Sequence, residues 1–302
     1  MSRTATWAGI GSDVTEMKTL DDVLNSAGLN FEVEKRPLYT RNAGKLIKID
    51  GTVSTVRKDT GDVLGIVGDK YQVCQNRDAF DFINYIDDDV KFVKAGITYS
   101  GLVYVIAELP KVTILDDGFK PYVIFQNGFN GGISIKAAIC PLRIVCQNQF
   151  NMAFKESNSY VSIRHNTTME QKLIQARDVL KATASYMSSI NETAQSLAAD
   201  KLPESQFIQI VDQMFEIKPE MSVRQQNQIL ARRDRLIFAY HADDNANFRG
   251  TAWGAVNAYS DFLTHVEPTR MTKNYDENHF MHVSFSSESM DRFIRNVEAH
   301  VA

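Results

Sequence analysis

The 302-residue sequence lacks any apolar run near the roughly 18 residues that cross a membrane. Its first residues, MSRTATWAGIGSD, contain no apolar h-region, so we expect neither a secretory signal nor a membrane partner. Cysteine is scarce, with three residues in the chain, which favours reduced thiols over a disulfide scaffold. These absences predict a cytoplasmic protein.

Metal-ligand spacing is also missing. Cys140 and Cys146, in AAICPLRIVCQNQFNMA, are further apart than the C-x2-4-C of zinc sites, and no second cysteine pair exists. On one strand the two thiols would lie about 20 Å apart. His279 and His282 lack the H-E-x-x-H pattern of a metalloprotease helix. We expect no metal, and we interpret Cys140 and Cys146 as packing residues.

Signatures of common enzymes are absent as well. The glycine-rich QNGFNGG segment has no G-K-[ST] and is better interpreted as a hairpin turn. There is no G-x-S-x-G elbow, no kinase motif set and no carboxylate cluster spaced for two metals. We therefore expect a protein that is not an enzyme and needs no cofactor.

The first half of the chain contains short segments rich in β-branched and aromatic residues, such as KLIKIDG and VSTVRKDTGDVLGIVG, and these predict strands. Two hairpins are expected, around Thr60-Gly61-Asp62 and Ser100-Gly101. Helices are expected in TLDDVLNSAGLNF, with Thr19 as N-cap, and in NRDAFDFINYI. From Thr167, more than thirty residues without Gly or Pro predict one helix on the order of 50 Å long, with an apolar stripe that includes Met169, Ala194 and Leu197.

Shorter helices follow, near 203–215 and 221–240, in RGTAWGAVNAYSDFLTH and in ESMDRFIRNVEAHV. The helix in RGTAWGAVNAYSDFLTH is expected to bury Trp253, Val256, Ala258 and Phe262. We predict an α+β fold: a curved antiparallel sheet in the N-terminal half with the long helix packed across it, and a helical C-terminal part. Residues 1–200 would form the sheet and long-helix core. Residues 201–302 would form the helical region, packed on the same domain.

The formal net charge is −4, but the charges are unevenly spread. Residues 121–165 carry four cations and one anion, whereas residues 201–302 carry eleven cations and fourteen anions. A groove for single-stranded nucleic acid combines cations with aromatic rings. The candidates are Arg57, Lys58, Lys70, Tyr71, Phe125, Phe129, Lys136, Arg143, Gln147, Arg164 and His165. Taken singly, each cation is more often a solvated surface residue; only the set suggests a groove.

Alternation along RIVCQNQF, if it is a strand, sorts its side chains onto two faces. One face would hold Arg143 and Gln147, which we expect to line the groove. The other would hold Cys146 and Asn148. Asn148 would then need buried hydrogen-bond partners, and we expect it to brace the backbone behind the groove.

Six blocks resemble the phage/plasmid-like protein family, which is catalogued as a domain of unknown function. They are TWAGIGSDV, AGLNFEVEKRPLY, LGIVGDKYQVCQNRDAF, AAICPLRIVCQNQFNMA, SIRHNTTMEQKLIQA and TAWGAVNAYSDFLTH, between residues 7 and 265. The R-[IV]-V-C-Q-N block and the later Arg-His are the most specific parts, and the sequence departs from the usual form at Gln149. The resemblance implies an origin in mobile elements and supplies no catalytic residues.

The element order is also similar to that of phage single-strand annealing proteins of the Rad-fifty-two and RecT/Redβ-like group. That resemblance implies a homo-oligomeric ring or filament that binds single-stranded DNA and anneals complementary strands in homologous recombination without ATP. The alternative is a phage or plasmid accessory protein that binds a host or phage protein, in anti-defence or replication, in the host cytoplasm. The acidic clusters YIDDDV and HADDNAN favour it slightly, since they could meet a basic partner. A third possibility, a nuclease, is disfavoured by the missing carboxylate constellation.

Overall fold

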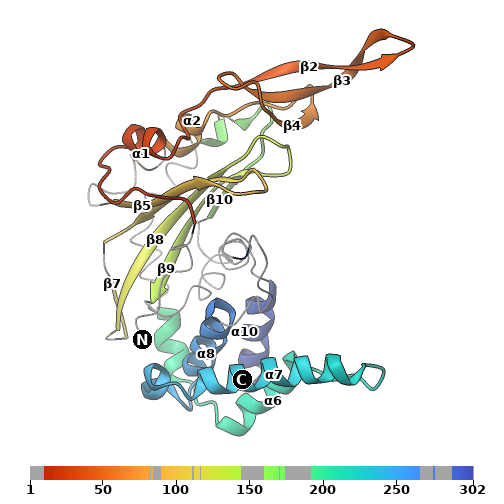
Figure 1. Ribbon diagram of the computed structural model, residues 1–302. Coiled ribbons are helices and arrows are strands. Elements are labelled where there is room, and N and C mark those ends of the chain that lie inside the picture. Colours follow the sequence, from red (N-terminus) through yellow and green to blue (C-terminus); the bar gives the residue numbers. More distant parts are fainter. Residues whose placement is uncertain are drawn as a thin grey trace.

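The computed structural model describes residues 10–81, 90–110, 112–115, 117–143, 160–169, 171–173, 192–265 and 288–301, together with Ile83 and Tyr275. Strands come from the N-terminal half and form antiparallel sheets, while the C-terminal half is helical (Figure 1). The α+β prediction is therefore confirmed. The division at residue 200 stays a prediction.

Two sheets contain the described strands. The larger has the order β1-β5-β6-β8-β9-β10, with β7 paired to β8. Its strands are β1 (Ser12–Asp13), β5 (Lys91–Ile97), β6 (Val103–Glu108), β7 (Val112–Ile114), β8 (Asp117–Asn127), β9 (Ile135–Arg143) and β10 (Tyr160–Ile163). The smaller has the order β2-β3-β4, with β2 (Val33–Asn42), β3 (Lys45–Arg57) and β4 (Val63–Gly68).

The turns between strands agree with the sequence. The chain reverses between β3 and β4 at Thr60-Gly61-Asp62 and between β5 and β6 at Ser100-Gly101, as predicted. QNGFNGG connects β8 to β9, as expected for a hairpin turn. One detail differs: KLIKIDG and VSTVR form a single strand, β3. The chain passes from one to the other through Gly51, whose φ of 73° is a conformation that glycine adopts without a steric penalty.

Two short helices lie beside the larger sheet. In α1 (Leu20–Ser26), the Thr19 hydroxyl accepts a hydrogen bond from the backbone N–H of Asp22 at 3.2 Å, so the predicted N-cap is confirmed. Within NRDAFDFINYI, α2 comprises Asn76–Phe80, and most of the residues after Asp81 lie outside the described part of the chain. Phe80 of α2 packs edge-on against Phe125 of β8, with ring centroids 6.4 Å apart.

The core of the sheet lies around its central strand. Val103 to Ala107 of β6 are all buried, so side chains on both faces of this strand are covered. Buried polar groups accompany it at one end. The Asn127 side-chain amide donates to the Cys74 carbonyl and to Asn76 Oδ1, each at 3.0 Å. These hydrogen bonds connect the end of β8 to the start of α2.

The C-terminal helices pack around α8 (Ala252–His265), which contacts α7 and α10. Trp253, Val256, Ala258 and Phe262 of α8 are buried, as the sequence predicts. The other helical elements are α6 (Glu204–Met214), α7 (Val223–Tyr240), the 3-10 helix η2 (Asp243–Phe248) and α10 (Glu288–Val301). The predicted helices at 203–215 and 221–240 are thus confirmed to within two residues.

The long helix predicted from Thr167 lies largely outside the described residues. Met169, residues 171–173 and residues 192–199 are helical. Met169, Ala194 and Leu197 are buried, as expected for the apolar stripe. Whether the helix is continuous and crosses the sheet stays a prediction.

Candidate nucleic-acid interface

Several predicted site residues fall where the structure describes little. Gln147, Cys146 and Asn148 lie outside the described residues. Arg143 and Cys140 are in β9, where the backbone of Arg143 pairs with Phe119 of β8 and that of Cys140 with Tyr122. The proposed alternation beyond Arg143 therefore stays a prediction, and so does the packing role of the cysteines.

Two predicted residues, Tyr71 and His165, are in direct contact. Their rings stack with centroids 4.8 Å apart and an interplanar angle of 20°. The Tyr71 hydroxyl donates to the Gly128 carbonyl at 2.9 Å, and His165 Nδ1 donates to the Gln72 carbonyl at 3.1 Å. Both side chains are largely buried. They hold the segment after β4 against the segment after β10. Because the two rings stack on each other and are buried, their faces are not available for stacking with a nucleic-acid base.

Burial of this pair changes the ionisation of both groups. Removal from water lowers the pKa of His165, and the hydrogen bond to Gln72 opposes this only in part. Burial raises the pKa of Tyr71, so the phenol stays protonated. His165 Nε2 is buried and has no hydrogen-bond partner in the described part of the chain. The imidazole is therefore a neutral packing group with its proton on Nδ1.

Cations adjoin the stacked pair along the chain and through one backbone contact. Lys70 and Arg164 directly precede Tyr71 and His165, and both are exposed. Lys35 of β2 donates from Nζ to the Asp69 and Tyr71 carbonyls at 3.0 and 2.9 Å. The structure thus brings Lys70 and Arg164, 94 residues apart in sequence, to two segments joined by the Gln72 N–H to His165 carbonyl hydrogen bond. Lys136 is in β9, opposite Gln126.

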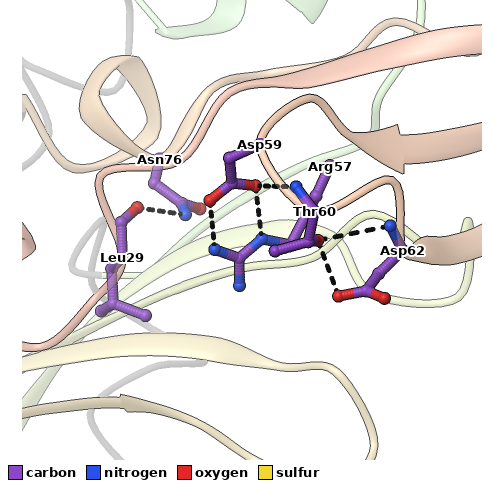
Figure 2. A network of polar contacts seen from close by, with 6 residues as sticks. All are labelled: Leu29, Arg57, Asp59, Thr60, Asp62 and Asn76. Carbon is purple, nitrogen blue, oxygen red and sulfur yellow. Dashed lines mark hydrogen bonds and ion pairs between the residues drawn. The ribbon is translucent and has the colours of Figure 1, made fainter.

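Arg57 and Lys58 are engaged within the β3–β4 turn and its surroundings. Arg57 Nε and Nη2 donate to the two carboxylate oxygens of Asp59 at 3.0 and 2.7 Å (Figure 2). The guanidinium also lies 4.0 Å from the centre of the Phe31 ring. Lys58 pairs with Glu32 at 2.5 Å. These ion pairs raise the pKa of both cations through hydrogen bonding to the carboxylates.

The turn containing Arg57 is internally braced. The Thr60 N–H donates to Asp59 Oδ1 at 2.9 Å, and its hydroxyl donates to Asp62 Oδ2 at 2.7 Å (Figure 2). Nearby, Asn76 Nδ2 donates to the Leu29 carbonyl at 2.9 Å (Figure 2). Because the Nε and Nη2 donors of Arg57 are bonded to Asp59, we interpret Arg57 as a residue that stabilises the turn and assign it no DNA contact.

The sequence reasoning missed the most exposed cationic feature, which we call the arm: the distal β2–β3 ribbon, residues 39–48. It projects away from the rest of the molecule (Figure 1). Every residue from 39 to 51 is exposed. Residues 35–49 carry five cations and no anion, a signal that could have been counted directly. Arg41, Lys45 and Lys48 form no ion pair within the described part of the chain.

The charge on the hairpin contrasts with the rest of the chain. Residues 33–57 contain six Lys or Arg and two Asp or Glu, a net charge of +4. Since the whole chain carries −4, the remaining residues carry −8. Positive charge is thus concentrated on one projecting element, which creates a local field attractive to polyanions.

The small sheet that carries the arm is fixed to the large one through the β8–β9 turn. The Thr55 hydroxyl donates to the Phe129 carbonyl at 2.7 Å. Gly65 of β4 lies so close to the same turn that a Cβ there would be 2.4 Å from Asn130 Cα. Phe129 and Phe125 are buried, in keeping with a packing role rather than base stacking. The base of the arm is therefore anchored, whereas residues 39–51 are all exposed.

Neither a metal site nor a membrane-spanning helix is found among the described residues. No group of three or more His, Cys, Asp or Glu side chains there is arranged to hold a metal ion. Nor does that part of the chain contain a helix both long and apolar enough to traverse a lipid bilayer.

Comparison with known proteins identifies one family. The family described as Domain of unknown function (DUF932) matches residues 63–283, and the chain belongs to it. No curated protein and no solved structure matches. The match begins at β4, so the arm lies outside the matched residues.

Proposed function

We propose that this DUF932 protein binds single-stranded DNA and anneals complementary strands without ATP, in homologous recombination of a phage or plasmid. The observation that carries the proposal is the concentration of cations on the arm and around its base, in a chain that is otherwise acidic. Lysine and arginine that neutralise phosphates supply most of the affinity in such complexes.

Aromatic character accompanies the charge. Tyr39 of β2 is 54% exposed and pairs across the ribbon with Lys48. Cross-strand partners share a face, so a ring for base stacking and a cation for phosphate lie side by side. Lys70 and Arg164 continue the positive charge at the base of the arm. The resemblance of element order to annealing proteins supports the annealing step and an oligomeric ring or filament.

Fluorescence anisotropy with a labelled 30-nucleotide single strand tests the binding. We expect micromolar or tighter binding at 50 mM salt, with an affinity that falls steeply as salt rises. A companion assay follows annealing of complementary oligonucleotides without nucleotide triphosphate. Absence of binding at micromolar protein and 50 mM salt would overturn the proposal. Binding without faster annealing would remove the annealing part.

A second candidate function is binding to a host or phage protein. Helix α7 favours it, because Val223 and Phe238 are 72% and 78% exposed on the surface. Exposed large apolar side chains commonly mark protein interfaces. Purification from the native host would then yield a stoichiometric protein partner with no nucleic acid. The partner should be lost from Val223→Ser/Phe238→Ser and retained by Arg41→Ala/Lys48→Ala; retention by both variants would argue against this candidate.

A further inference from the structure

We infer that the arm enters the major groove of duplex DNA and holds the product of annealing. The inference rests on the proposed function only in taking DNA as the ligand. It goes beyond that function by assigning a double-stranded ligand to a particular element.

The two faces of the arm both carry groups for a ligand. Pairing of Tyr39 with Lys48 and of Arg41 with Leu46 places these four side chains on one face. Pairing of Thr40 with Ile47 and of Asn42 with Lys45 places those four on the other. Each face thus combines at least one cation with at least one apolar side chain.

Exposure of both faces indicates the shape of the ligand. Leu46 is 66% exposed and Ile47 is 47% exposed, although they point to opposite sides. A two-stranded ribbon with nothing packed on it is marginally stable in water, which favours a bound state that covers it. A single strand laid along the ribbon covers one face. A groove covers both at once.

The major groove of B-DNA is a ligand surface that can cover both faces of the arm. It is about 12 Å wide and admits a two-stranded β-ribbon. Phosphates line its two walls, where cations on opposite faces of one ribbon can reach them. Its floor exposes thymine methyl groups, which accept apolar contacts, and the hydrogen-bond acceptors of guanine, which accept from Arg or Lys.

Exposed aliphatic side chains could also contact a second copy of the chain. The charge of the arm favours DNA over that alternative. Arg41, Lys45 and Lys48 are unpaired in the described part of the chain, and residues 35–49 contain no anion. Two arms would therefore repel one another. DNA supplies a continuous row of charges opposite in sign to the arm.

The first experiment compares two triple variants. Arg41→Ala/Lys45→Ala/Lys48→Ala removes three cations from the arm, and Lys218→Ala/Arg224→Ala/Arg235→Ala removes three exposed cations from the helical part. Affinities are measured for a 30-base-pair duplex and for one of its strands at 100 mM salt. We expect the arm variant to lose affinity for both ligands, because the arm is also part of the proposed single-strand site, and to lose at least threefold more for the duplex than for the strand. The control should change both by less than twofold.

The salt dependence gives a second measure. Loss of three phosphate contacts should reduce the slope of log K against log salt by roughly 2.7 for the duplex. Methylation of guanine N7 by dimethyl sulfate reports on the major groove, since N7 lies there. Wild type should protect N7 in the duplex, and the arm variant should not. The variant side chains are exposed, and an unchanged thermal melting curve verifies folding.

The outcomes are distinguishable. Unchanged duplex affinity in the arm variant, equal losses for duplex and strand, or no N7 protection by wild type would each overturn the inference. Conversion of an oligomer to a monomer with unchanged duplex binding would also overturn it and assign the arm to an interface between copies. A wild type that binds duplex but not single strand overturns the proposed function and leaves this inference standing.

Discussion

Tyr71 and His165, 94 positions apart, stack with ring centroids 4.8 Å apart and lock together the segments that follow β4 and β10. Each also donates a hydrogen bond to a backbone carbonyl, of Gly128 and Gln72 respectively. This contact holds the base of the arm against the large sheet, and it places the exposed Lys70 and Arg164 on joined segments.

Acidification should destabilise the protein through His165. Burial lowers its pKa in the folded state, so below about pH 6.5 the unfolded state binds the proton while the folded state does not. The stabilising contribution is full above that pH and is lost as pH falls. Urea unfolding between pH 7.5 and 5.5 measures it. His165→Asn keeps a donor but does not titrate, so its stability should depend less on pH; equal dependence would contradict the prediction.

Tyr71→Phe should lower the free energy of unfolding by about 1–3 kcal/mol, because the buried Gly128 carbonyl loses its donor. The ring remains and can still stack on His165. Tyr39→Phe is the matched control, since Tyr39 is exposed on the arm, and its effect should stay within about 0.5 kcal/mol. Chemical denaturation compares the two. Equal effects would show that the Tyr71 hydroxyl contributes nothing.

Gly65→Ala should loosen the docking of the small sheet and cost about 1–3 kcal/mol. Its new Cβ would be 2.4 Å from Asn130 Cα, which only a backbone shift can relieve. Gly68, in the same strand, has open space where a Cβ would lie, with no atom within 4 Å, so Gly68→Ala should change stability by about 1 kcal/mol or less. Thermal melting measures both, and a stable Gly65→Ala protein would contradict the observed packing.

Lys70→Ala/Arg164→Ala should weaken single-strand binding without loss of stability, because both side chains are exposed. Two lost phosphate contacts would reduce the salt slope by roughly 1.4. The comparison is with Lys218→Ala/Arg224→Ala, which removes the same charge elsewhere. If the two double variants bind alike, the base of the arm does not contact DNA.

Arg143→Ala should likewise weaken single-strand binding several-fold while the protein remains folded, as expected for a groove residue at the end of β9. Lys136→Ala, seven residues earlier in the same strand, tests whether the groove continues along β9. Anisotropy gives the affinities and circular dichroism verifies folding. Wild-type affinity for Arg143→Ala would exclude the residue from the groove.

Local patterns were sufficient for many elements. The Thr19 cap, the Thr60-Gly61-Asp62 and Ser100-Gly101 turns, and the buried stripe of α8 depend on neighbours within a few residues, so periodicity and turn chemistry predict them. Predicting the binding residues was harder. Tyr71 and His165 have the residue types of a DNA site, but only long-range packing reveals that their side chains are used internally.

The sequence by itself determined the α+β order of elements, the family, and the excess of cations in residues 35–49, because composition and short-range periodicity are local properties. Only the tertiary structure decided which cations are available. Arg57 forms an ion pair with Asp59, and Lys58 forms one with Glu32. In contrast, β4 pairs with β3 only as far as Thr52, so Arg41, Lys45 and Lys48 remain exposed on the arm. That difference arises from where strands end and which charges meet across the fold, which no local pattern encodes.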